Sequence, residues 1–252
     1  MREYPEIFYR RNMLQGRSTA RETVPLVMEL IGPKSVVDVG CSAGTWLAVF
    51  EECGVKDVFG IDGFYARKEL LEIPQERFLA HDLQEPFRLD RTFDLVVSLE
   101  VAEHLPKESA VGFVDSLTRL GPVVLFSAAI PFQGGEGHLN EQWPEYWARL
   151  FEAHGYVGVD CLRKRVWHNP NVSWYYAQNI LVYARRESLE SYPRLKQEFE
   201  VTVWPPMALI HPTRYLATAD LRQVPLRRLL KALPAAFALG VRETLKKRDP
   251  VK

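Results

Sequence analysis

The stretch that decides the fold is residues 35–44, which read SVVDVGCSAG. It begins as a short apolar run rich in β-branched residues and ends in a turn of glycine and other small residues. A helical pattern follows at residues 45–53, where apolar residues recur at the spacing of one helix face. Glycine in such a turn lets a ligand approach the backbone and leaves the first N–H groups of the helix exposed. The stretch therefore predicts a buried strand, a ligand-binding turn and a helix in succession.

The same alternation continues along the chain. Further strand-like runs lie at residues 58–62, 77–79, 93–99, 122–127, 156–160 and 176–183, and helical patterns at residues 109–120 and 145–154. Strands that alternate with helices pair in parallel through right-handed crossovers, so they form an open sheet covered by helices on both faces. We therefore expect an α/β fold with a doubly wound sheet. Ligands bind beyond the carboxyl ends of such strands, and we expect the chemistry in the residues that follow them.

Composition narrows the class of protein. Of the 252 residues, 47% are hydrophobic and 25% charged, which excludes wholesale disorder. Thirty-two Lys and Arg balance thirty-two Asp and Glu, so the chain is a poor candidate for sequence-independent nucleic-acid binding. Three cysteines without a CxxC spacing argue against a disulfide framework or a zinc knuckle. We find neither a transmembrane span nor the apolar stretch of a signal peptide, and we expect a soluble, cytoplasmic protein.

Two aspartates bracket the glycine-rich turn. Asp38 precedes the turn by two residues, where a carboxylate would repel the pyrophosphate of a dinucleotide. Asp62 ends the second strand-like run, where it can accept hydrogen bonds from ribose hydroxyls. This pair suits a nucleoside ligand that carries an amino group and a sulfonium.

Five segments resemble the class I S-adenosylmethionine-dependent methyltransferases. They are VVDVGCSAG at 36–44, GIDG at 60–63, AHDL at 80–83, FDLVVSLEVAEHLP at 93–106 and VVLFSAAIP at 123–131. The resemblance covers roughly residues 20–185, and it implies a Rossmann-like sheet of seven strands, mostly parallel with the last strand antiparallel. It also implies S-adenosylmethionine as the cofactor, although Ser42 replaces the middle glycine of the family's turn. The cofactor-binding residues that it implies are Asp38, Gly40, Ser42 and Gly44 near the methionine end, Asp62 and Gly63 near the ribose, and Asp82 and Leu83 near the adenine.

A metal site is the second expectation. Glu100, Glu103 and His104 are spaced three and four residues apart, which places them on one face of a helical turn. His138 follows the next strand-like run and would reach the same sheet edge. The set looks like the metal site of the plant small-RNA 2′-O-methyltransferases, which implies that all four residues bind one divalent cation, Mg²⁺ or Mn²⁺. The alternative is a solvated loop in which Glu100 orders the cofactor and His104 packs.

The expected reaction follows from these groups. An alcohol is a poor nucleophile, and a metal or a general base would activate it. The candidate catalytic residues are His138, Glu100 and His104, although one nitrogen of His138 cannot be both ligand and base. We expect O-methylation of a sugar or glycan hydroxyl, with an acceptor pocket in the aromatic-rich residues 166–176. The alternatives are the 3′-terminal ribose of an RNA, a quinone or phenol, and a cofactor-binding scaffold without turnover.

The pattern changes after about residue 186. We therefore expect a methyltransferase domain at residues 1–186 and a helical extension at residues 187–252, in which repeated prolines prevent one long helix. Residues 226–247 are basic and amphipathic. Such a stripe usually packs on the parent domain or on a second copy in a homodimer, and contact with a membrane surface is the alternative.

Overall fold

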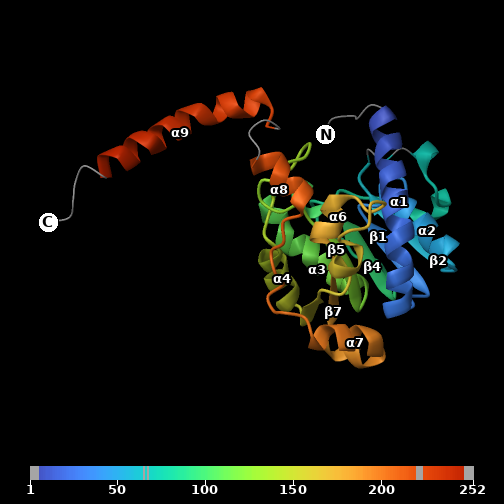
Figure 1. Cartoon of the computed structure of the whole chain (residues 1–252). Coiled ribbons are helices and arrows are strands. Elements are labelled where there is room, and N and C mark those ends of the chain that lie inside the picture. Colours follow the sequence, from blue (N-terminus) through green and yellow to red (C-terminus); the bar gives the residue numbers. More distant parts are fainter. Residues whose placement is uncertain (1–5, 65, 67, 220–223, 247–252) are drawn as a thin grey trace. The chain divides into compact units, whose positions relative to one another are not determined.

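The computed structural model describes residues 6–64, 66, 68–219 and 224–246 (Figure 1). The chain forms two compact units, one that extends to His211 and a second that begins at Pro212. None of the described helices is long and apolar enough to span a membrane.

A seven-stranded sheet organises the first unit. Its strands are β1 (Ser35–Val39), β2 (Asp57–Asp62), β3 (Phe78–Ala80), β4 (Leu95–Leu99), β5 (Val123–Ser127), β6 (Tyr156–Val159) and β7 (Leu181–Arg185). Their order is β3-β2-β1-β4-β5-β7-β6, and β7 runs antiparallel to both of its neighbours while the other pairings are parallel. The predicted Rossmann-like sheet is confirmed.

Helices cover both faces of this sheet (Figure 1). One face packs against α1 (Glu6–Leu30), α2 (Thr45–Glu52) and α7 (Pro193–Glu200), and the other against α3 (Ala110–Leu120) and α4 (Pro144–Glu152). Alternate strand residues point to opposite faces. Val36 accordingly lies in the first core and Val37 in the second, while Leu95 and Val96 divide in the same way. Burial on both faces explains why these strands read as continuous apolar runs.

The strand expected at residues 176–183 is partly wrong. Residues Trp174–Asn179 form the helix α6, and β7 begins only at Leu181. Gln178 donates a hydrogen bond from its side-chain amide to the side-chain oxygen of Asn179. Neighbouring residues of a strand point to opposite faces, so the helical turn is what lets these two buried amides meet.

The domain boundary expected at residue 186 lies too early. Leu189 and Leu195 are buried in the core that also contains α1 and α2. Farther along, Trp204 and Pro206 lie so close to Gly158 of β6 that a Cβ there would sit 3.1 Å from each. Pro193 does not interrupt the fold, because it occupies the first turn of α7, where a missing N–H costs nothing.

The first unit also contains the short helix α5 (Arg163–Val166). The second unit contains α8 (Pro212–Ala219) and α9 (Leu226–Lys246). The C-terminal segment is helical as expected, in separate helices. Pro234 nevertheless lies inside α9 rather than ending it, and Lys247 of the predicted amphipathic segment falls outside the described residues.

Candidate active site

A cavity of about 450 Å³ lies at the carboxyl ends of β1 and β4. The strand order reverses between these two strands, and this is the place where doubly wound sheets bind ligands. The cavity is lined by Met13, Gly16, Asp38, Gly40, Cys41, Ser42, Thr45, Trp46, Leu99, Glu100, Glu103, His104, Gln133, Gly134, Gly135, Glu136, His138, Trp174, Tyr175 and Tyr176. It therefore joins the glycine-rich turn to the expected metal residues in one space.

Backbone strain collects at the same sheet edge. Among the described residues other than glycine, a positive φ occurs at Ser42 (52°), Glu100 (54°) and Phe132 (66°). They follow β1, β4 and β5, respectively. Non-glycine residues adopt this conformation at a cost, and they gather at functional sites where the surroundings impose it.

The turn after β1 requires glycine at its first position. Gly40 has a φ of 88°, and a Cβ added there would lie 2.3 Å from the side chain of Val101. The turn can therefore lie directly against the segment that follows β4. Gly44, at the start of α2, is also left-handed, with a φ of 78°.

Two buried aspartates support this turn. The carboxylate of Asp62 accepts the backbone N–H of Ser42 at 2.5 Å and that of Gly63 at 2.6 Å. Burial, and then the charge of Asp62, raise the pKa of Asp38 well above its usual value. A positively charged ligand group beside Asp38 would therefore stabilise its ionised form.

The predicted cofactor residues do not all line the cavity. Asp38, Gly40 and Ser42 do, whereas Gly44, Asp62, Gly63, Asp82 and Leu83 are not among the lining residues. Asp82 is exposed in the turn after β3, where its side chain accepts the N–H of Gln84 at 3.1 Å, and Leu83 is buried.

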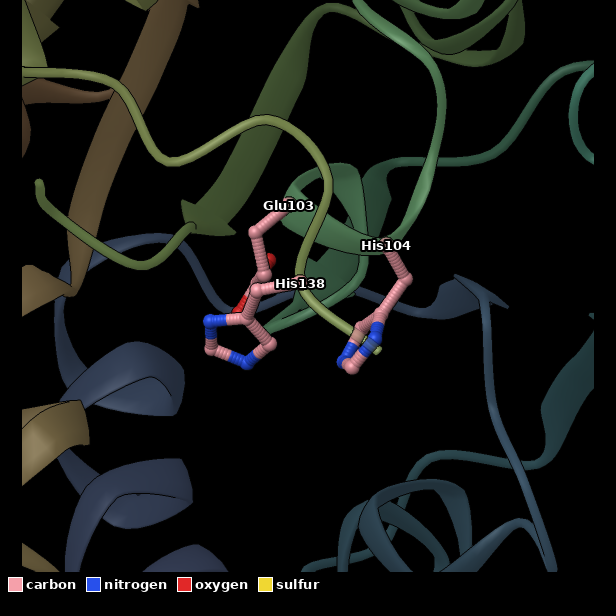
Figure 2. A group of neighbouring side chains, drawn as sticks. All are labelled: Glu103, His104 and His138. Atoms are coloured by element: carbon pink, nitrogen blue, oxygen red, sulfur yellow. The ribbon is translucent and has the colours of Figure 1, made fainter. Parts of the chain in front are cut away.

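Three of the four predicted metal ligands meet on the cavity wall. Ligand atoms of Glu103, His104 and His138 all lie within 4.8 Å of one another. Figure 2 shows these side chains extending from two segments, the turn after β4 and the loop after β5. The backbone N–H groups of Leu139 and Asn140 donate to the carbonyl oxygen of Glu103 at 2.7 and 3.0 Å, and these bonds tie the second segment to the first.

Glu103 is the unusual member of this group. Its side chain is completely buried, and no described residue makes a hydrogen bond of good geometry to either carboxylate oxygen. Burial, and then the charge of Glu100, raise its pKa well above the usual value, and the backbone groups of Glu103 and Ala129 oppose that rise without cancelling it. An unpaired buried carboxylate is costly, and a cation or a proton removes that cost.

Glu100 lies outside this group of three. The left-handed backbone of Glu100 precedes the short 3₁₀ turn Ala102–His104, so the expected common helical face does not form. Its carboxylate instead accepts hydrogen bonds from Gln133 and Asn179, each at 3.0 Å. Burial raises the pKa of Glu100, and the bond from Asn179 opposes that rise. Nothing in the spacing of Gln133 and Asn179 along the sequence indicates that they meet Glu100.

The two imidazoles face one another at right angles, with ring centroids 4.8 Å apart. Partial desolvation, and then His138, lower the pKa of His104, which favours its neutral, ligand-competent form. Nδ1 of His138 lies 2.9 Å from Oε1 of Glu141, which also accepts the N–H of Gly134 at 2.7 Å. Because a carboxylate only accepts, Nδ1 donates, and in the neutral ring the lone pair therefore lies on Nε2. Glu141 was also missed, and its signal was the His-x-x-Glu spacing.

The predicted acceptor stretch divides between two places. Trp174, Tyr175 and Tyr176 of α6 line the main cavity, where Tyr176 contacts Trp46 at a centroid distance of 5.5 Å. Trp167 and His168 line a separate cavity of about 460 Å³. Asn169 and Asn171 bond to Glu22 of α1 and do not line either cavity.

The chain is similar to known methyltransferases. A family model described as a methyltransferase domain matches residues 9–161. A probable protein arginine N-methyltransferase 6 of Arabidopsis thaliana is 22% identical over 195 residues, which is 71% of this chain and 45% of that protein. The chain thus spans less than half the length of this relative.

Solved structures show the same fold. The sugar N-methyltransferase KedS8 of Streptoalloteichus sp ATCC 53650 matches with a TM-score of 0.56 at 17% identity, over 74% of this chain and 94% of that one. The methyltransferase domain of the bacterial protein CtHen1 matches with a TM-score of 0.50 at 19% identity, over 66% and 97%. With its family match, its sheet order and its glycine-rich turn, the chain belongs to the class I S-adenosylmethionine-dependent methyltransferases.

Proposed function

We propose that this methyltransferase transfers the methyl group to a hydroxyl of a sugar or glycan, at a divalent cation held by Glu103, His104 and His138. The observation that carries the proposal is the buried carboxylate of Glu103, to which no described residue makes a hydrogen bond of good geometry and which lies beside two imidazoles. These residues line the same cavity as the glycine-rich turn.

The donor set suits a divalent cation. One carboxylate and two imidazoles favour a transition metal such as Mn²⁺ over Mg²⁺, which prefers oxygen ligands. The cation would offset the charge of Glu103 and occupy the lone pair that Glu141 leaves on Nε2 of His138. A bound cation acts as a Lewis acid, lowering the pKa of an acceptor hydroxyl and orienting its oxygen.

The remaining chemistry falls to the chain's own residues. Glu100 lines the cavity and is the carboxylate that we assign to take the hydroxyl proton, because burial raises its pKa and so makes it a stronger base. Gln133 and Asn179 hold its two oxygens in place. The acceptor oxygen forms a bond to the methyl carbon as the carbon–sulfur bond breaks. The electron pair of that bond stays on sulfur, and the proton ends on Glu100.

Two observations favour a sugar-type acceptor. Trp174 and Tyr175 line the cavity and offer aromatic faces for stacking on a sugar ring. Residues 1–211 contain 22 Lys and Arg against 29 Asp and Glu, a net charge of −7. That excess of acid weighs against an RNA acceptor, because RNA binding depends on neutralising phosphates.

The test is methyl transfer from labelled S-adenosylmethionine to a panel of sugars, amines, phenols and RNA ends, with Mn²⁺ or with a chelator. We expect label on a hydroxyl acceptor in Mn²⁺, and loss of transfer by about 10²-fold in the chelator. Glu103→Gln should show the same loss in Mn²⁺, whereas Glu108→Gln, at an exposed glutamate outside the cavity, should not. Undiminished transfer to an amine in the chelator would contradict the proposal.

A further inference from the structure

The boundary between the two units also divides the charge of the chain. From Pro212 onward the sequence contains 10 Lys and Arg against 3 Asp and Glu, a net charge of +7. The overall neutrality of the chain therefore conceals an acidic catalytic unit and a basic C-terminal unit. Such an asymmetry is typical of chains whose basic part contacts an anionic surface.

Helix α9 carries an exposed apolar face. Leu226, Leu230, Leu233 and Phe237 follow one another at intervals of four, three and four residues, which places them on one side of the helix. Their exposed fractions are 70%, 56%, 58% and 77%. Large side chains left this exposed in an ordered row indicate a surface for a partner.

The basic residues of α9 occupy the other side. At about 100° per residue, Arg227, Lys231 and Arg228 lie roughly 100°, 140° and 200° around the helix from Leu226. No acidic residue occurs between Leu226 and Leu239. Between Leu226 and Phe237 the helix thus separates an apolar face from a side whose charged residues are all cationic.

Exposed apolar side chains concentrate both in α9 and in the segment that precedes it. Among the described residues, 12 of the 19 exposed large hydrophobic side chains lie at residues 201–239. They include Val201, Trp204 and Met207, which belong to the end of the first unit. In the rest of the described chain, exposed large hydrophobic side chains are fewer and more widely spaced along the sequence, so the C-terminal part exposes more apolar surface.

We propose that the apolar face of α9 docks on a lipid bilayer that contains anionic headgroups. Nucleic acid would neutralise Arg227, Arg228 and Lys231 but leave the leucines and Phe237 in water. A second copy of α9 would cover the apolar face, but it would bring cationic residues together without acids to pair them. An anionic bilayer satisfies both faces, with the apolar side chains in the acyl boundary and the cations at the headgroups.

The test is co-sedimentation of the full chain with phosphatidylcholine vesicles that either contain or lack phosphatidylserine. We expect binding that requires phosphatidylserine and weakens with added salt. Replacing Arg227, Arg228 and Lys231 together by Gln should lower the apparent affinity on the order of 100-fold, at roughly fivefold per basic residue. Leu230→Asp with Phe237→Asp should abolish binding, since it removes the apolar anchor.

Matched controls come from the first unit. Val111→Asp alters an exposed apolar side chain of α3, and Arg149→Gln removes an exposed cation of α4. Both should bind vesicles as the wild type does. S-Adenosylmethionine affinity should be unchanged in the α9 variants. This measurement distinguishes a variant that has lost only its membrane-binding surface from one that has unfolded.

Three outcomes would overturn the proposal. The first is equal sedimentation with and without phosphatidylserine. The second is a dimer in sedimentation velocity that Phe237→Asp dissociates while vesicle binding is absent. The third is binding of an RNA oligonucleotide at the same salt concentration without any vesicle binding. None of these outcomes bears on the metal site of the proposed function.

Discussion

One buried carboxylate supports the glycine-rich turn and another lies on the cavity wall beside two histidines, and the two carboxylates differ in their hydrogen bonding. On the cofactor side, Asp62 is 3% exposed and accepts backbone N–H groups from Ser42 and Gly63. On the opposite side, Glu103 is completely buried, and no described residue makes a hydrogen bond of good geometry to its carboxylate. The carboxylate of Asp62 already has hydrogen-bond donors within the protein. The carboxylate of Glu103 is placed at a cost that a bound cation or a proton offsets, so the two sites should respond differently when each acid is removed.

The largest effect is expected at the carboxylate without a partner. Glu103→Gln should lower methyl transfer by about 10²-fold or more, because it removes an anionic ligand. The thermal stability of the metal-free variant should equal or exceed that of the wild type, since an uncompensated buried charge disappears. Calorimetry in a chelator provides the measurement. If Glu103→Gln instead lowers the thermal stability and loses activity for that reason, Glu103 and Asp62 do not differ in the way we predict.

His138→Ala should reduce turnover by a similar factor of about 10² while leaving cofactor affinity nearly intact, because it removes an activating group rather than a nucleoside contact. Turnover is measured at saturating cofactor. If added metal never alters the rate, the loss in His138→Ala identifies this residue as a general base and not as a ligand.

At the other carboxylate, Asp62→Ala should weaken S-adenosylmethionine binding by about 1–3 kcal/mol, because two backbone N–H groups lose their acceptor. Isothermal titration gives this value. Unlike Glu103→Gln, the change should also lower thermal stability. Unaltered cofactor affinity would remove Asp62 from the cofactor site.

A smaller effect is expected at Glu141, whose carboxylate is hydrogen-bonded to His138 and to the N–H of Gly134. Glu141→Ala should lower turnover roughly tenfold, since His138 loses the acceptor that fixes its ring. Glu141→Gln keeps an acceptor oxygen at the same place and should restore most of the rate. Equal losses in the two variants would argue against this orienting role.

The smallest effect concerns pH. Burial raises the pKa of Asp38 well above its usual 3.8, so the free protein holds this proton to higher pH than the unfolded chain does. A cationic cofactor favours the ionised form, and its affinity should rise with pH until the raised pKa is passed, by at most about tenfold per pH unit. Asp38→Asn should flatten this dependence. An equally steep profile in the variant would assign the proton to another group.

The sequence predicts the sheet well because its strands are buried on both faces and carry the signal in their own residues, as Val36 and Val37 do. The sequence predicts secondary structure poorly where polar residues are buried in the interior. Gln178 and Asn179 read as part of a strand, yet they form α6 because their amides bond to each other and to Gln133. The boundary at residue 186 failed for a related reason, since Leu189 and Leu195 stand isolated among charges but pack into the core.

The candidate site was predicted in its residue types but not in its division of roles. Spacing alone placed Glu100 and Glu103 on one helical face. Because Glu100 has a left-handed φ, its carboxylate bonds to the amides of Gln133 and Asn179. Glu103 lies beside the imidazoles instead. A local periodicity argument cannot see this, because Asn179 comes from a segment far along the chain.

The most direct test of the central claim is to titrate Mn²⁺ into the full chain with S-adenosylhomocysteine bound, following heat and paramagnetic resonance. We predict one site per chain in the wild type and in Glu108→Gln, and no site in Glu103→Gln. Absence of binding in the wild type, or an undiminished site in Glu103→Gln, would contradict the account.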